Sequence, residues 1–363
     1  MDIRYPRLTI NTAKLRENAR TVAGLCARHG IDVWGVTKGL SGDPRLAQLY
    51  VDAGFKGVSD SRLLNLQGIR DAGVPARLQL MRIAMPSEAE DLVRIADVSL
   101  QSEVSTILLL NEMAHKMGRT HEVLLMIDIG DLREGFWPKE LTHIGEPLRG
   151  LRGGVRITGV ATNFACASGV LPTRQKFEDL VGYRDEIQKF LGTHMPVVSV
   201  GGTCCLKVIE ESGVPDGINQ IRMCEAVVTG MDTAFAREIP YLHRDALTLS
   251  AEIVECREKP SVPDGEVGMQ AFGEKPVFID RGKRRRALLG IGRQDVNVDR
   301  IKPLQPGVHV VTASSDHLIV DVTEAEAREP GTRFKPGDVL DFRPLYPAML
   351  SLSTSRYVAV SYD

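Results

Sequence analysis

Lys38 is the first residue of this 363-residue chain whose type and position could support chemistry. It follows the apolar run 33–37 and precedes Gly39, so we expect its amine at the end of a strand, beside the start of a helix. A lysine amine held in such a place can act as a nucleophile. The alternative interpretation is an ordinary solvated surface lysine.

A charged loop with two glycines follows another apolar run. Segment 128–135 begins with Asp128 and contains Arg133, whose guanidinium could bind an anionic oxygen. The alternative interpretation is a turn held together by a structural Asp–Arg pair. The segment is therefore a candidate anion clamp.

Small residues follow two late apolar runs. Residues 199–204 read Ser-Val-Gly-Gly-Thr-Cys, and residues 221–225 read Ile-Arg-Met-Cys-Glu. A Gly-Gly-Thr turn before a helix exposes backbone N–H groups and a hydroxyl, which suit a phosphate group. A tight turn without a ligand is the alternative interpretation.

Composition excludes several classes of protein. The 45 basic and 47 acidic residues give a net charge of −2, which favours neither nucleic acid nor an anionic membrane as partner. The first 19 residues show no signal-peptide pattern, and no window approaches the roughly 18 apolar residues of a membrane span. The six cysteines form no C-x-x-C pair, so we expect reduced thiols and no metal site. A cytoplasmic protein with a small-molecule partner is the resulting expectation.

The elements that position these residues follow from periodicity. Short apolar runs alternate with amphipathic stretches between residues 30 and 230, which predicts βα units and a parallel sheet. Eight such units indicate a TIM-type (β/α)8 barrel, whose strand C-termini carry the chemistry. The predicted strands are 33–38, 57–61, 76–83, 97–102, 123–130, 157–165, 197–202 and 226–230.

After about residue 240 the pattern changes to β-branched runs separated by Pro and Gly turns, with few helical stretches. We therefore predict an α/β barrel over residues 1–238 and a C-terminal all-β domain over 239–363, to which residues 1–10 could add a strand. Segment 261–276 lacks a clear period and is predicted to be a loop that could reach a site.

Taken together, these motifs resemble the alanine racemase family of fold-type III pyridoxal-phosphate enzymes. The similarity rests on Val36-Thr37-Lys38, the Asp-x-Gly-x-x-Arg-x-Gly block, Thr162-Asn163-Phe164-Ala165 and Ile-Arg-x-x-Glu, in this order. It looks closest to the ornithine racemase branch, through segments 162–173, 258–278, 289–296 and 314–324. The resemblance covers nearly the whole chain.

The resemblance implies pyridoxal 5'-phosphate as cofactor and assigns roles to residues. Lys38 matches the lysine that forms the Schiff base and transfers a proton on one face of the substrate. Arg133 matches the arginine that binds the phenolic oxygen, Asn163 stands near the ring, and Arg222 faces the pyridine nitrogen. The implied phosphate-binding residues are Thr203, Cys204, Met223, Cys224 and Thr354, and Ser199 and Gly202 belong to the same cofactor-binding set.

The second proton-transfer group is left open by the sequence. Where the family has a tyrosine contributed by the partner subunit, the alignment places Phe272, which cannot carry a proton. Asp316 and His317 are the candidates to replace it, because a histidine titrates near neutral pH and an adjacent carboxylate could orient it or act itself. A surface histidine in a β turn is the alternative interpretation.

The implied activity is racemisation of a free amino acid, with a basic substrate such as ornithine or lysine expected from the resemblance. A basic side chain requires an acidic partner, which Asp131, Glu134 or Asp316 could supply. The alternatives are an alanine or broad-specificity racemase, a fold-type III decarboxylase or aldolase, and a non-catalytic cofactor-binding protein. The resemblance also implies a homodimer with composite active sites. The preferred substrate, the pathway and any role of the nearby cysteines stay open.

Overall fold

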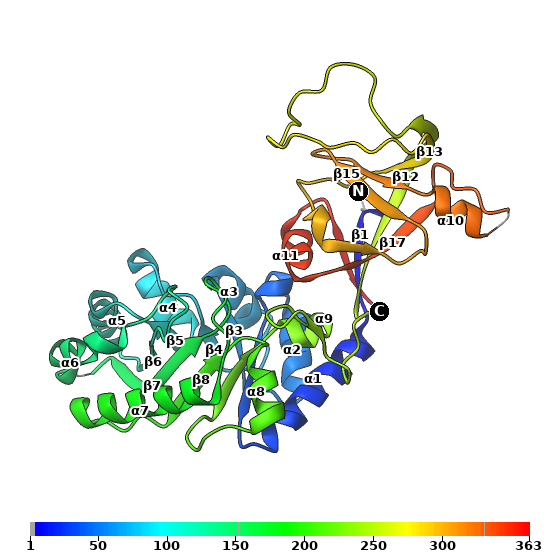
Figure 1. Cartoon of the computed structure of the whole chain (residues 1–363). Helices are drawn as coiled ribbons and strands as arrows, with labels where there is room; N and C mark the ends of the chain where they lie inside the picture. Colours follow the sequence, from blue (N-terminus) through cyan, green and yellow to red (C-terminus); the bar gives the residue numbers. More distant parts are fainter. Residues whose placement is uncertain (1–3, 152, 330) are drawn as a thin grey trace. The chain divides into compact units, whose positions relative to one another are not determined.

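The computed structural model describes residues 4–151, 153–329 and 331–363. The chain divides into two compact units, Ala13–Arg244 and Met1–Thr12 with Asp245–Asp363 (Figure 1). The short ribbon β10 (Met231–Asp232) and β11 (Arg237–Glu238) lies in the first unit. The boundary falls six residues after the predicted one, because the backbone of His243 is hydrogen-bonded to the Asn18 side chain of the first unit.

The first unit contains a closed barrel of eight parallel strands, in which β9 pairs with β2 to complete the ring. The strands are β2 (Asp32–Val36), β3 (Gly57–Asp60), β4 (Leu78–Leu80), β5 (Val98–Gln101), β6 (His121–Met126), β7 (Val155–Asn163), β8 (Val197–Gly201) and β9 (Gln220–Met223). All eight strands run in the same direction, so their C-terminal ends share one rim.

Helices connect the barrel strands, as Figure 1 shows. They are α1 (Thr12–Ala27) before the barrel, then α2 (Pro44–Asp52), α3 (Leu63–Asp71), α4 (Ala89–Ile95), α5 (Val104–Lys116), α6 (Leu141–Arg149), α7 (Arg174–Leu191), α8 (Cys205–Ser212) and α9 (Glu225–Thr229). Among the described residues, no helix is long and apolar enough to cross a membrane.

Apolar side chains fill the barrel interior. Trp34 of β2 packs in one cluster with Leu124 and Met126 of β6, and these two strands stand opposite each other in the ring. Gly57, which pairs with Trp34, leaves room for the indole, because a Cβ there would lie 2.6 Å from the ring. Side chains from opposite strands therefore meet across the interior and hold the barrel closed.

The predicted eighth strand at 226–230 is wrong. Residues 225–229 form helix α9, and the eighth strand is β9, which contains Gln220 and Arg222. A short apolar run buried on every side has the same pattern in a helix and in a strand, so periodicity could not separate them. The polar residues of β9 hid the strand, although both are buried in the fold.

The second unit is built on a mixed sheet. Its strands are β1 (Arg7–Ile10), β12 (Leu247–Pro260), β13 (Lys283–Leu289), β14 (Ile301–Pro303), β15 (His309–Ala313), β16 (Leu318–Asp321), β17 (Val339–Pro344) and β18 (Ala359–Tyr362). The order is β14-β17-β12-β13-β16-β15, and β1 lies between β12, to which it is antiparallel, and β18, to which it is parallel.

Two helices accompany this sheet, α10 (Thr323–Arg328) and α11 (Tyr346–Thr354), so the second domain is β-rich with a helical minority. Segment 261–282, which contains the predicted loop, has neither a helix nor a strand. The predicted fold class, a (β/α)8 barrel followed by a β domain, is confirmed.

Candidate active site at the barrel rim

Lys38 lies directly beyond β2, at the start of a 3-10 turn that spans Lys38–Leu40. Its side chain is half-buried and forms no ion pair with any described residue. It borders a cavity of about 330 Å³ with residues from the ends of β3 and β4 and from the loop after β6. The lining residues are Lys38, Ser61, Met81, Arg82, Ile83, Arg133 and Glu134.

The loop after β6 is shaped by Asp128 and Gly135. The Asp128 carboxylate accepts hydrogen bonds from the backbone N–H groups of Gly130 at 2.8 Å and Leu132 at 3.2 Å. Gly135 has a φ of +143°, and a Cβ there would lie 2.3 Å from the backbone nitrogen of Asp128. Only glycine permits this close return of the chain, which brings Arg133 and Glu134 to the cavity.

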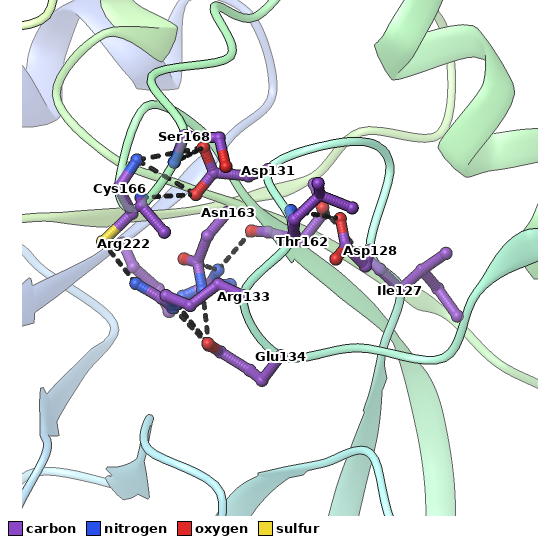
Figure 2. Close-up of polar contacts among 12 residues, drawn as sticks. Ile127, Asp128, Asp131, Arg133, Glu134, Thr162, Asn163, Cys166, Ser168 and Arg222 are labelled. Atoms are coloured by element: carbon purple, nitrogen blue, oxygen red, sulfur yellow. Dashed lines mark hydrogen bonds and ion pairs between the residues drawn. The ribbon is translucent and has the colours of Figure 1, made fainter.

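Asp131 ties this loop to the loop after β7 (Figure 2). Its buried carboxylate accepts backbone N–H groups from Cys166 at 3.1 Å, Ala167 at 2.8 Å and Ser168 at 3.2 Å, and a fourth from Val170 at 3.3 Å. Four donors use the acceptor capacity of one carboxylate. Asp131 therefore holds two loops together and has little capacity left for a ligand.

Arg133 and Glu134 form an ion pair that reaches Asn163 at the end of β7 (Figure 2). Glu134 Oε1 accepts a hydrogen bond from Asn163 Nδ2 at 3.0 Å, and Arg133 Nη1 contacts Cys166 Sγ. Burial lowers the pKa of Arg133, but the contacts with Glu134 outweigh burial and leave the pKa above its ordinary value. Arg133 thus stays a cation beside the cavity.

Arg222 is the largest fully buried side chain of the described residues. Its Nη2 donates to Thr162 O at 2.6 Å and to Asn163 Oδ1 at 3.0 Å, and its Nη1 donates to Ser199 Oγ. Burial lowers the pKa of Arg222 to about 10, which still leaves a cation at neutral pH. Gly201 makes room for it, since a Cβ there would lie 2.5 Å from Nη2.

One donor of Arg222 is left over. The buried Nε has no hydrogen-bond partner within the part of the chain that the structure describes. A buried N–H without an acceptor is costly, so such groups in native structures have a reason. An acceptor atom of a bound ligand would be such a reason, because it would pair with this N–H.

The turn after β8 contains Gly202, Thr203 and Cys204 and leads into α8. The Thr203 hydroxyl accepts a hydrogen bond from the Ala226 backbone N–H at 3.0 Å and lies 3.6 Å from Met223 Sδ. It is buried and joins this turn to α9, so a phosphate here would depend mainly on backbone N–H groups. Gly202 adopts a φ of +107°, which suits glycine.

Cys204 and Cys224 lie at the ends of β8 and β9, and Cys224 is half-buried. Cys204 is buried, and burial raises the pKa of Cys224 to about 12, with Lys38 acting in the opposite direction. A thiol in this state is a weak nucleophile.

Three predicted residues lie in the second unit. His317 Nδ1 is 3.2 Å from Asp316 Oδ1 in the accessible turn between β15 and β16. Hydrogen bonds from Ser314, Ser315 and His317 lower the pKa of Asp316. Thr354 ends α11, and its hydroxyl donates to the carbonyl oxygens of Leu350 at 3.1 Å and Ser351 at 3.0 Å.

The structure therefore joins Lys38 and Arg133 around one cavity, and Arg222, Ser199 and Asn163 in one hydrogen-bonded group. Sequence reasoning missed Ser61, which lines the cavity, and Asp60, a buried carboxylate just before it. The available signal was their position at the C-terminal end of a barrel strand.

Comparison with known proteins identifies the family. The alanine racemase N-terminal domain model matches residues 10–214. The chain is 38% identical to a lysine racemase of Thermotoga maritima over 359 residues, which are 99% of each chain. The chain belongs to the alanine racemase family. An ornithine racemase of Acetoanaerobium sticklandii is 35% identical, over 98% of each chain. The resemblance inferred from the motifs is confirmed, and alanine racemase family enzymes in general depend on pyridoxal phosphate.

Solved structures agree on the fold. An alanine racemase of Streptomyces lavendulae superimposes with a TM-score of 0.74 at 16% identity, covering 98% of this chain and 96% of that one. A D-threonine aldolase of Filomicrobium marinum gives a TM-score of 0.72 at 18% identity, covering 96% and 88%. At this identity the two structures share the fold with this chain, which is the alanine racemase family architecture.

The barrel rim fits pyridoxal phosphate by the chemistry of its groups. The amine of Lys38 can bond to an aldehyde carbon, and Arg133 is a cation for a phenolic oxygen. The unpartnered Nε of Arg222 needs an acceptor, which a pyridine nitrogen provides.

Proposed function

We propose that this chain racemises a free basic amino acid, such as lysine or ornithine, with pyridoxal 5'-phosphate as cofactor. The observation that carries the proposal is the grouping of Lys38, Arg133 and Glu134 around one cavity. Identity of 38% and 35% to a lysine and an ornithine racemase over nearly full length supports it.

Residues at the rim would hold the cofactor in stated roles. Lys38 would bind the aldehyde through its amine, Arg133 the phenolic oxygen, and Arg222 Nε the ring nitrogen, with Asn163 beside the ring. The turn Gly202–Cys204 would bind the phosphate through backbone N–H groups. The remaining proposed phosphate-binding residues are Met223, Cys224 and Thr354, whereas Ser199 would act on the cofactor through its hydrogen bond with Arg222. When bound, pyridoxal phosphate withdraws electrons from the substrate and makes its Cα–H acidic.

Arg222 sets the strength of that withdrawal. Its pKa of about 10 keeps the guanidinium protonated at neutral pH, so Arg222 would donate a hydrogen bond to the ring nitrogen and would leave that nitrogen without a proton. Weaker withdrawal of electrons favours return of the proton to Cα over protonation elsewhere. Arg222 thus favours racemisation over transamination.

Racemisation requires a proton donor or acceptor on each face of Cα. The Lys38 amine would accept or donate the proton on one face. His317 or Asp316 would serve the other face, because Phe272 has no ionisable proton. The 3.2 Å contact between His317 Nδ1 and Asp316 Oδ1 supports a pair in which the carboxylate orients the imidazole.

Glu134 is our candidate for the side-chain ammonium of the substrate. It lines the same cavity as Lys38, whereas the carboxylate of Asp131 is used by four backbone N–H groups. A carboxylate has about four acceptor positions. Glu134 therefore retains capacity beside its contacts with Arg133 and Asn163.

We further propose that the protein forms a homodimer with composite active sites and that it is located in the cytoplasm. Val277 and Ile279 are 89% and 68% exposed in the second unit, which is apolar surface suited to a partner. All six cysteines lie in the described residues and are free thiols, as a reducing compartment favours. Light scattering of the purified protein gives its molar mass and so tests the homodimer.

The test is isotope exchange by the cofactor-loaded protein in D2O. L-Lysine, L-ornithine and L-alanine are incubated separately, and the products are analysed by chiral chromatography and NMR. We expect the D-enantiomers of lysine and ornithine with deuterium at Cα, and no exchange with Lys38→Ala. Faster turnover of alanine would assign a different specificity. Release of carbon dioxide or an aldehyde would contradict racemisation.

A further inference from the structure

Asp60 is a buried carboxylate outside the residues discussed so far. It ends β3, is fully buried, and forms no ion pair with any described residue. Oδ2 accepts the Thr37 hydroxyl at 2.7 Å, and Oδ1 accepts Asn65 Nδ2 at 2.9 Å and the Arg62 backbone N–H at 3.0 Å. Burial raises the pKa of Asp60, and these hydrogen bonds oppose the rise. An unpaired buried carboxylate is costly, so its partners matter.

Two of those partners hold the turn that carries Lys38. Thr37 immediately precedes Lys38, and its carbonyl accepts the backbone N–H groups of Leu40 at 3.0 Å and Gly42 at 3.1 Å, which closes the turn. Gly42 packs directly on Asn65, because a Cβ at Gly42 would lie 2.3 Å from Asn65 Cβ. Both ends of the turn are thus attached to groups that bind one carboxylate.

Lys38 and Asp60 both lie near the Cys224 thiol and act on its pKa in opposite directions, Lys38 lowering it and Asp60 raising it. Asp60 also accepts the backbone N–H of Arg62, the residue just before α3, and a purely structural role in this loop is the competing explanation.

We propose that Asp60 is a positioning residue for Lys38, acting through Thr37 and Asn65 to hold the turn so that the amine faces the cavity. This inference rests on the proposed function, in which Lys38 is the reactive amine. A small displacement of a reacting group can slow a reaction about a hundredfold, so the hydrogen bonds to Asp60 control the reactivity of Lys38.

The experiment measures how fast pyridoxal phosphate labels Lys38. Protein freed of cofactor is mixed with pyridoxal phosphate, borohydride reduces the linkage at timed intervals, and peptide mass spectrometry measures labelled Lys38. Thr37→Val removes the hydroxyl and keeps the side-chain shape, and Asp60→Asn removes the charge. Ser59→Ala is the matched control, since it loses one buried hydrogen bond on the same strand, 2.8 Å to Gln79.

We expect labelling to slow about tenfold to a hundredfold in Thr37→Val and Asp60→Asn, with a lower kcat at nearly unchanged KM for the amino acid. Thr37→Ser keeps the hydroxyl and is expected to restore the labelling rate. The two Thr37 variants therefore test the inference also when Asp60→Asn fails to fold. Labelling of both Thr37 variants at the Ser59→Ala rate would overturn the inference. Failure of the wild-type protein to label at Lys38 would instead refute the proposed function.

Discussion

Replacing the buried Arg222 by glutamine is expected to change stability little, although the side chain is only 2% exposed. The fall of its pKa from 12.5 to about 10 means that the fold disfavours the charged form by roughly 3 kcal/mol, at about 1.4 kcal/mol per tenfold change. Glutamine removes this cost. Its amide has two N–H groups for the three acceptors Ser199 Oγ, Thr162 O and Asn163 Oδ1, so at least one of them is left unsatisfied at about 1–3 kcal/mol.

These opposing contributions leave the free energy of unfolding of Arg222→Gln within about 2 kcal/mol of wild type. Arg237→Gln is the matched control. Arg237 pairs with Glu210 at 2.7 Å and with the buried Asp232 at 3.2 Å, and these contacts outweigh burial and raise its pKa. Removing it leaves a buried carboxyl group without its ion pair and is expected to cost roughly 3 kcal/mol.

The assay is urea unfolding of cofactor-free protein at neutral pH, followed by circular dichroism. The same Arg222→Gln protein loaded with pyridoxal phosphate is expected to racemise more slowly and to transaminate more. A loss of stability in Arg222→Gln as large as in Arg237→Gln would refute the reasoning, because the Arg222 charge would then be compensated in the fold.

Four further outcomes are expected. Gly201→Ala places a Cβ 2.2 Å from Asn163 Oδ1, so it should cost about 1–3 kcal/mol of stability and weaken cofactor retention during dialysis, measured by absorbance. Glu134→Gln should lower kcat/KM for lysine roughly tenfold to a hundredfold. An equal loss with alanine would argue against Glu134 as the ammonium partner. His317→Ala should exchange deuterium at Cα while slowing inversion, and undiminished racemisation would remove it from the mechanism. Burial lowers the pKa of His121 from 6.5 to about 4, so between these pH values the folded protein binds fewer protons than the unfolded chain. The free energy of unfolding therefore decreases by about 3 kcal/mol as the pH falls from 6.5 to 4. His121→Gln should flatten that dependence in urea unfolding.

The barrel could be predicted because its signal is local and repeated. Seven of the eight predicted strand positions overlap barrel strands, since a buried parallel strand is a short apolar run whatever surrounds it. The exception at 226–230 shows the limit. The buried Arg222 of β9 is stabilised by Ser199 and Asn163, which are distant in sequence.

The roles of Lys38, Arg133 and Arg222 in the candidate site stay predictions. Their places at strand ends were visible in the sequence, from the bounding glycines and the order in the chain. Their hydrogen-bond partners were not, because a hydrogen bond depends on distance and direction. Asp131 and Glu134 looked alike as acidic residues of one loop, yet one binds four backbone N–H groups and the other lines the cavity.

The sequence by itself determined the family, the repeated βα architecture and the lysine at the first barrel strand, because all three are encoded in residue type and order. Only the tertiary structure decided which polar groups are satisfied internally and which are left for a ligand. Thr203 is bound to Ala226, and Arg222 keeps one buried N–H without an acceptor among the described residues. Those outcomes depend on how eight strand ends meet at one rim, and no single segment specifies that.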